Sequence, residues 1–96
     1  MAKKPTKKVE TPEQKHRRLV RACMKFAREH GACISGMDIA RGRTLQEAWK
    51  LLDFRMRCWV TNELLGFNEG FRLQRVTQFK LPWLSVRKYV VDAGLA

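Results

Sequence analysis

The chain has 96 residues, 45% of them hydrophobic, and a formal net charge of +11 at pH 7. This length allows one domain with one small core, and the apolar content is too high for a wholly disordered chain. No apolar run approaches a membrane span, and none follows the first lysines as in a secretory signal, so we expect a cytoplasmic protein, with a nucleoid-associated location compatible with its charge. Cys23, Cys33 and Cys58 are odd in number and lack framework spacing, which predicts reduced thiols.

Most of the charge lies at the start of the chain. Ten of the first 28 residues are Lys or Arg and only Glu10 and Glu13 are acidic, a net charge of +8. Such self-repulsion does not stabilise a small fold, so it favours a polyanionic partner: nucleic acid first, an acidic protein or an anionic membrane second. We predict a flexible basic arm over residues 1–10 and a single small domain, mostly helical and similar in order to a winged helix, over residues 11–96.

The domain is expected to begin with an amphipathic helix. Thr11 and Gln14 form a capping box, Pro12 suits the first helical position and Gly31 ends the helix. Its apolar face consists of Leu19, Ala22, Cys23, Phe26 and Ala27. Cations recur at three- and four-residue spacing along one flank, at Arg18, Arg21, Lys25 and Arg28.

Two further helices are predicted, a short one from Ser35 to Gly42 and a long one over residues 44–65 that opens with the Thr44–Glu47 capping box. The long helix has two apolar faces on nearly opposite sides. One contains Leu45, Ala48, Trp49, Leu52, Met56, Trp59 and Val60, and the other Leu51, Phe54, Cys58 and Leu65. Either this helix is central and covered on both sides, or Leu51, Phe54 and Leu65 form an interface with a second copy of the chain or with another protein.

After Gly66 the apolar period changes to two, which predicts a strand or hairpin over residues 71–81, launched from an Asn68-Glu69-Gly70 turn. Residues 83–93 are expected to form a last helix, with a strand as the alternative. The fold class is therefore predicted as α+β, with three to four helices and a short β ribbon in the order of a winged helix-turn-helix module.

In that architecture the start of the long helix enters the major groove, so Gln46, Glu47 and Lys50 would face bases while the ribbon contacts the backbone. The phosphate contacts would come from Arg41, Arg43, Arg72, Gln74, Gln78 and Lys80. Arg41-Gly42-Arg43, directly before a helix N-terminus, is a candidate phosphate site, although Arg41 and Arg43 are equally expected to pair with Asp38 or Glu47 at the surface. The length and apolar start of the long helix count against a recognition helix, and a small α+β domain with a merely solvated basic surface stays open.

Catalytic and metal sites find no support in the sequence. No carboxylate pair, Gly-rich phosphate loop or nucleophile elbow is present, and His30-x-x-Cys33 lacks a second ligand pair, so we expect no enzyme, cofactor or metal. His30 is expected to stabilise the end of its helix. The aromatic residues Trp49, Trp59, Trp83, Phe71, Phe79 and Tyr89 are expected mostly to pack in the core rather than stack on bases, with Phe67 and Trp83 left open for partner contact.

Two function classes follow. The first is a non-enzymatic nucleic-acid-binding protein, DNA more than RNA, acting as a regulator or accessory factor. Its contact residues would be Lys3, Lys4, Lys7, Lys8, Arg18, Arg21, Lys25, Arg28, Arg41, Arg43, Lys50, Arg72 and Lys80. The second is a protein-binding inhibitor or adaptor of phage or mobile-element type that docks an acidic surface of a host machine. A ribonucleoprotein component is a weaker third. A continuous basic strip would favour nucleic acid, whereas a basic rim around Leu51, Phe54 and Leu65 would favour a protein.

Overall fold

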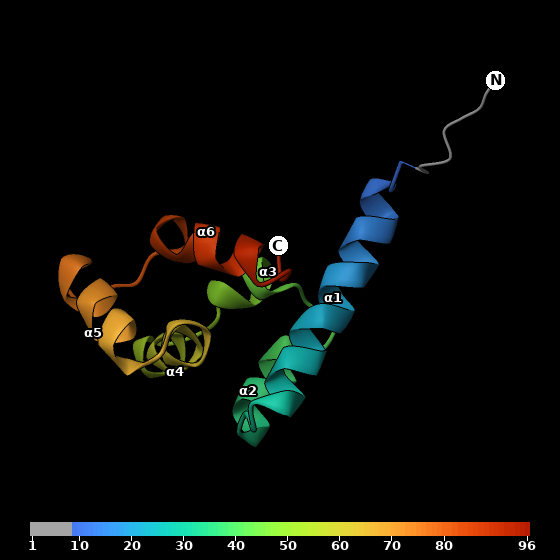
Figure 1. Cartoon of the computed structure of the whole chain (residues 1–96). Coiled ribbons are helices and arrows are strands. Elements are labelled where there is room, and N and C mark those ends of the chain that lie inside the picture. Colours follow the sequence, from blue (N-terminus) through green and yellow to red (C-terminus); the bar gives the residue numbers. More distant parts are fainter. Residues whose placement is uncertain (1–8) are drawn as a thin grey trace.

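The computed structural model describes residues 9–96, which form six helices and no strand. The predicted α+β class is therefore wrong for this part of the chain. The helices are α1 (Pro12–Glu29), α2 (Ile34–Ala40), α3 (Leu45–Trp49), α4 (Phe54–Leu65), α5 (Phe67–Val76) and α6 (Trp83–Asp92), arranged as Figure 1 shows. Residues 1–8, most of the predicted basic arm, lie outside the described residues.

Helix α1 follows the sequence prediction. Thr11 and Gln14 form a complete capping box, and the chain leaves the helix at Gly31, whose φ of 75° suits glycine. The inner face buries Leu19, Cys23 and Ala27, whereas every residue from 11 to 18 is exposed. The first turns of α1 therefore extend beyond the rest of the molecule, as Figure 1 shows.

The long helix predicted over residues 44–65 is two helices. Helix α3 ends at Trp49, and Asp53 starts α4 by accepting a hydrogen bond from the Met56 N–H at 2.9 Å. The break does not bury both predicted apolar faces: in the second set, Leu51 and Phe54 are exposed, and Cys58 and Leu65 are only partly buried. Leu45, Ala48 and Trp49 of α3 and Val60 of α4 are all buried.

The predicted β ribbon is helix α5 and the loop after it. Residues 70, 73 and 74 are buried, which is helical spacing, and the proposed turn at residues 68–70 lies inside the helix. Gly70 allows α5 to pack closely on α4, since a Cβ at this position would meet the Asn62 side chain and lie 3.1 Å from its Cγ. The alternation of apolar residues over 71–81 was coincidental, and without the ribbon the winged-helix order does not hold.

The connection from α5 to α6 has an uncommon backbone conformation, and buried contacts hold it in place. Gln78, Phe79 and Leu81 all have positive φ, between 46° and 63°. The Thr77 hydroxyl accepts a hydrogen bond from the Leu81 N–H at 3.1 Å, and Leu81 is completely buried. The last helix, α6, then forms as predicted, with Val86 and Val90 facing the core.

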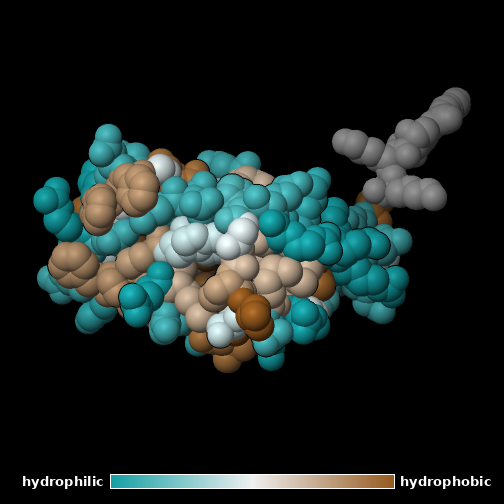
Figure 2. Space-filling model, turned by 90° about the horizontal axis from the view of Figure 1, so that it is seen from below, coloured by the Kyte–Doolittle hydropathy of each residue, from teal (hydrophilic) through white to brown (hydrophobic). Residues whose placement is uncertain are grey.

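The helices form two packed groups. Helices α1, α2 and α3 pack on one another, and α4 packs on α5 and α6. Trp49, Arg57 and a side-chain hydrogen bond of 2.7 Å between His30 and Glu63 join the groups. Figure 2 shows a hydrophilic surface over the start of α1 and apolar residues over the opposite part of the molecule. None of the helices within residues 9–96 has the length and apolar content of a membrane crossing.

Candidate nucleic-acid interface

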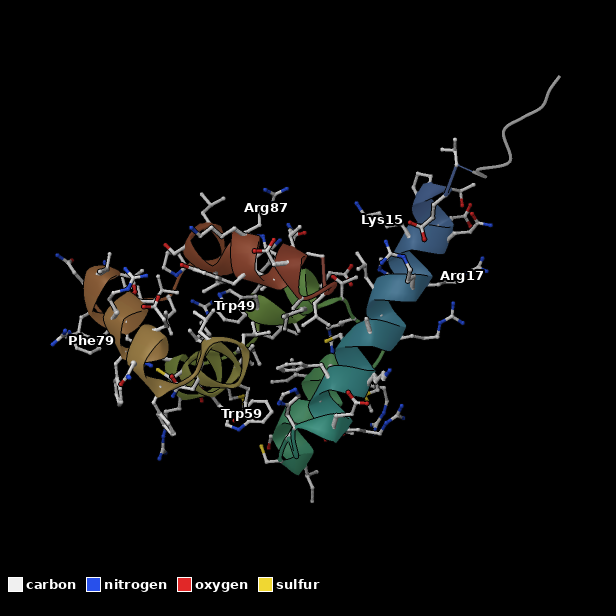
Figure 3. The ribbon with its side chains drawn as sticks, in the orientation of Figure 1. Lys15, Arg17, Trp49, Trp59, Phe79 and Arg87 are labelled. Atoms are coloured by element: carbon white, nitrogen blue, oxygen red, sulfur yellow. The ribbon has the colours of Figure 1, made fainter. Side chains whose placement is uncertain are left out.

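The outward side of α1 is a basic face. Five exposed cations lie on the side of the helix opposite Leu19, Cys23 and Ala27, and we call them the α1 basic face: Arg17, Arg18, Arg21, Lys25 and Arg28. Figure 3 shows Arg17 pointing away from the body of the molecule and Lys15 extending from another side of the same helix. The predicted stripe is thus confirmed as an exposed surface, with Arg17 as an added member.

Acidic residues neutralise this face only in part. Arg18 donates two hydrogen bonds to Glu10, at 2.8 and 3.1 Å, and thereby lowers the pKa of that carboxyl below its ordinary value. Two further pairs within the helix, Arg17 with Glu13 and Lys25 with Glu29, are exposed and 4.0 Å long, which makes them weak. Arg21 and Arg28 form no ion pair with any of residues 9–96. A net positive surface therefore remains.

The Arg41-Gly42-Arg43 turn lies beside this face, because Gly42 lines one shallow depression together with His16, Arg17, Val20 and Arg21 of α1. Arg41 pairs with Asp38 at 3.0 Å, which confirms the surface pairing expected as one alternative. Arg43 instead donates to the Ile39 carbonyl at 3.1 Å. The turn adds charge to the surface around α1 but holds no preformed fork for a phosphate.

The predicted anion site at the start of the third helix is not present. Helix α3 has only five residues, and its capping box uses the backbone amides of Thr44 and Glu47. The Glu47 carboxylate lies at this end and contacts His16 of α1 at 3.2 Å. The hydrogen bond from the Thr44 backbone, assisted by His16, lowers the pKa of Glu47. A carboxylate in this position repels a phosphate, because both groups are negatively charged.

The base-reading residues predicted on this helix do not form a recognition surface. Gln46, Glu47 and Lys50 are exposed, but α3 is short and directs Leu45, Ala48 and Trp49 inward, and Glu47 is engaged by its cap and by His16. A recognition helix needs several adjacent polar side chains directed at base edges.

The contacts assigned to the ribbon are dispersed. Arg72 pairs with Glu69 on α5 at 2.9 Å, and Lys80 is exposed in the loop after α5. Figure 1 shows α5 on the opposite side of the molecule from α1. Gln74 is buried and donates to Asn62 at 3.4 Å, so its predicted phosphate contact is wrong, while Gln78 is exposed. The structure therefore brings together α1 and the Arg41-Gly42-Arg43 turn, but not the cations of α5. Lys3, Lys4, Lys7 and Lys8 lie outside the described residues.

The residues predicted as a protein interface do not share one helix face. Leu51 is exposed in the connection between α3 and α4, Phe54 is the first residue of α4, and Leu65 packs against the core. Leu51 and Phe54 remain on the surface, but the two-faced helix that motivated the set does not exist.

Two exposed aromatic pairs lie on α5 and around it. Phe67 and Phe71 stack with ring centroids 6.1 Å apart, and Phe54 meets Phe79 edge-on at 6.2 Å. All four rings are exposed, and we call them the aromatic end. Packing was therefore the wrong interpretation for Phe71 and Phe79, whereas the other aromatic residues of that set, Trp49, Trp59, Trp83 and Tyr89, do pack. The mistaken β pattern concealed this surface, because it placed residues 71 and 79 on an inner face.

The histidines and cysteines serve the fold. His30 caps α1, stacks on Phe26 and bonds to Glu63, consistent with its predicted structural role. Burial raises the pKa of the Cys23 thiol to about 11 and also raises that of Cys58. Within residues 9–96, no three His, Cys, Asp or Glu side chains are grouped closely enough to hold a metal ion.

Comparisons with protein-family models, curated proteins and solved structures find no match to this chain.

Proposed function

We propose that the protein binds nucleic acid through the α1 basic face and the neighbouring Arg41-Gly42-Arg43 turn. The observation that carries this proposal is an exposed face of five cations on α1 that acidic residues neutralise only in part. Cations in this arrangement neutralise phosphates and release counterions, which supplies most of non-specific affinity.

The proposed mode is phosphate contact without base reading. The α1 basic face runs from Arg17 to Arg28, about 17 Å along the helix, so it can follow several phosphates of a duplex. No second element of the described chain presents a polar face suited to base edges, so we expect little sequence preference. A non-enzymatic accessory or regulatory role in the cytoplasm, on DNA before RNA, agrees with this mode.

The test compares two variants with equal loss of charge. Arg21→Gln with Arg28→Gln removes the two cations of the α1 basic face that form no ion pair within residues 9–96, and Arg87→Gln with Lys88→Gln removes two exposed cations of α6. Binding of the full chain to duplex DNA and single-stranded RNA is measured by fluorescence anisotropy across a salt series. We expect the α1 variant to lower the slope of log K against log salt by about 2, and the α6 variant to leave it unchanged. Equal effects of both variants would contradict the assigned face, and weak binding at low salt would exclude the function.

The aromatic end supports a second candidate, docking of a protein with an acidic surface. Phe67, Phe71 and Arg75 lie along one ridge of α5 at four-residue spacing, and Arg75 and Lys80 form no ion pair within residues 9–96. Exposed aromatic residues with flanking cations are typical of interface cores and complement an acidic rim.

This candidate requires a purified partner. A protein captured by the full chain would be purified. Its affinity would then be measured for the Phe67→Ser/Phe71→Ser variant and for the Arg21→Gln/Arg28→Gln variant. Loss of affinity in the first variant alone supports docking at the aromatic end. Light scattering would detect a dimer of the chain. If the first variant dissociates that dimer, the aromatic end is instead assigned to contact between two copies.

A further inference from the structure

An apolar pocket lies between the two helix groups. Its volume is about 260 Å³, and α1, α2 and α3 line one side while α4 lines the other. Phe26 and Ile39 face Met56 and Trp59 across it, and the rings of Phe26 and Trp59 meet edge-on at 6.2 Å. Figure 2 views the side of the molecule where apolar residues surround a hollow. Ligand sites are commonly found at such junctions between packed units.

One charged side chain lines this pocket. Arg55 is exposed and forms no ion pair with any of residues 9–96, and no acidic residue lines the pocket. The remaining lining is apolar side chains, glycines and the thiols of Cys23 and Cys33. The charge complement of such a site is a ligand with an apolar body and one anionic group, and the planar guanidinium fork suits a carboxylate.

Gly36 gives a second, independent observation. It lies inside α2, where glycine is less favourable than alanine, and its φ is not in the left-handed region. A Cβ at this position would meet the Ala32 Cβ at 3.5 Å and the Cys33 Sγ at 3.7 Å, which are ordinary contacts. Neither the backbone nor the packing therefore requires a glycine here. Its missing side chain leaves room in the pocket that Gly36 lines.

We infer that the pocket binds a small monocarboxylate with a compact apolar body, whose carboxylate contacts Arg55 and whose body lies between α2 and α4. The site is separate from the α1 basic face and does not depend on the proposed function. A ligand there contacts both helix groups, so its binding also stabilises their packing.

The test is calorimetric titration of the full chain with octanoate, octan-1-ol and octylammonium. We expect octanoate to bind best and Arg55→Met to weaken octanoate about tenfold while leaving octan-1-ol unchanged. Gly36→Leu fills the pocket and should abolish binding, whereas the matched Gly36→Ala should retain it. Equal octanoate affinity in the wild type and Arg55→Met, or undiminished binding by Gly36→Leu, would overturn the proposal.

A thiol measurement keeps the proposal testable if Gly36→Leu fails to fold. Cys33 lines the pocket and is exposed, whereas Cys58 does not line it. Octanoate should slow alkylation of Cys33 by iodoacetamide and leave the rate at Cys58 unchanged. Equal protection of both thiols, or of neither, would refute a ligand in this pocket. A solution dimer that Gly36→Leu dissociates would also refute the proposal, because the pocket would then belong to a contact between two copies of the chain.

Discussion

Trp49 lies where the two helix groups meet. Its indole N–H donates to the Leu81 carbonyl at 2.9 Å, and its own carbonyl accepts hydrogen bonds from Arg57 at 2.8 and 3.2 Å. Arg57 also donates to the Lys80 carbonyl and lies 5.6 Å from the centre of the Trp49 ring. These two side chains tie α3 and α4 to the connection between α5 and α6, so Arg57 is a structural cation.

Two tryptophans that touch each other should respond differently to replacement by phenylalanine. Trp49→Phe leaves the buried Leu81 carbonyl without its donor and should lower the free energy of unfolding by about 1–3 kcal/mol. Trp83→Phe removes an indole N–H that is buried without a partner among residues 9–96, so it should cost less than about 1 kcal/mol. Urea denaturation of both variants checks this. Equal losses would show that ring volume, rather than the hydrogen bond, decides stability.

Glu47 should contribute a pH-dependent stability. Its pKa is lowered from an ordinary value of 4.5, first by the Thr44 backbone and then by His16, so its contribution is present above pH 4.5 and is lost as the pH falls through the lower folded-state pKa. Glu47→Gln should therefore be less stable than the wild type at pH 7, with the difference shrinking below pH 4.5. Denaturation midpoints between pH 2.5 and 7 measure it, and a difference that is constant over this range would contradict the prediction.

At the scale of the elements, side-chain caps determine where helices begin, and one close contact determines how α5 packs on α4. Asp53 divides the run without Gly or Pro, because its side chain caps a new helix after α3 has ended at Trp49. Gly70 then brings α5 against Asn62 of α4, with a would-be Cβ 3.1 Å from the Asn62 Cγ. Local propensity alone disfavours a glycine within α5, so the contact between helices accounts for it.

The same substitution at two helical glycines should have opposite signs. Gly70→Ala forces Asn62 aside and should destabilise the protein by about 1–3 kcal/mol, more than its gain in helix propensity. Gly36→Ala meets only ordinary contacts and should stabilise it by up to about 1 kcal/mol. Thermal denaturation of the two variants is the measurement. Stabilisation by Gly70→Ala would show that α5 does not pack on α4 at this point.

For the whole molecule, the three thiols report how the helix groups open. Cys33 is exposed, Cys58 is half-buried with a raised pKa, and burial raises the pKa of Cys23 to about 11. Alkylation at pH 8, followed by mass spectrometry, should label Cys33 first and Cys23 last. Because Cys23 lies in the core, its rate should rise in urea in parallel with global unfolding. Labelling of Cys23 as fast as Cys33 in buffer would mean that α1 detaches from the core.

The sequence by itself determined what local chemistry controls. The capping box of Thr11, the apolar spacing through Leu19, Cys23 and Ala27, and the stop at Gly31 predicted α1 and its basic face, because these interactions lie within a few turns of one helix. The last helix was predicted in the same way. The cations of α1 could be assigned to a surface for the same reason.

Only the tertiary structure decided the remainder. Residues 71–81 match a strand in local pattern, but α5 is stabilised by contacts with α4 at Gly70, Leu73 and Gln74 that no local pattern contains. The break before Asp53 is likewise accompanied by contacts between distant residues, because Trp49 donates to the Leu81 carbonyl and accepts from Arg57. The surface followed in turn, because the packing of the helices placed Gly42 beside α1, moved Arg72 away from it and exposed the aromatic end.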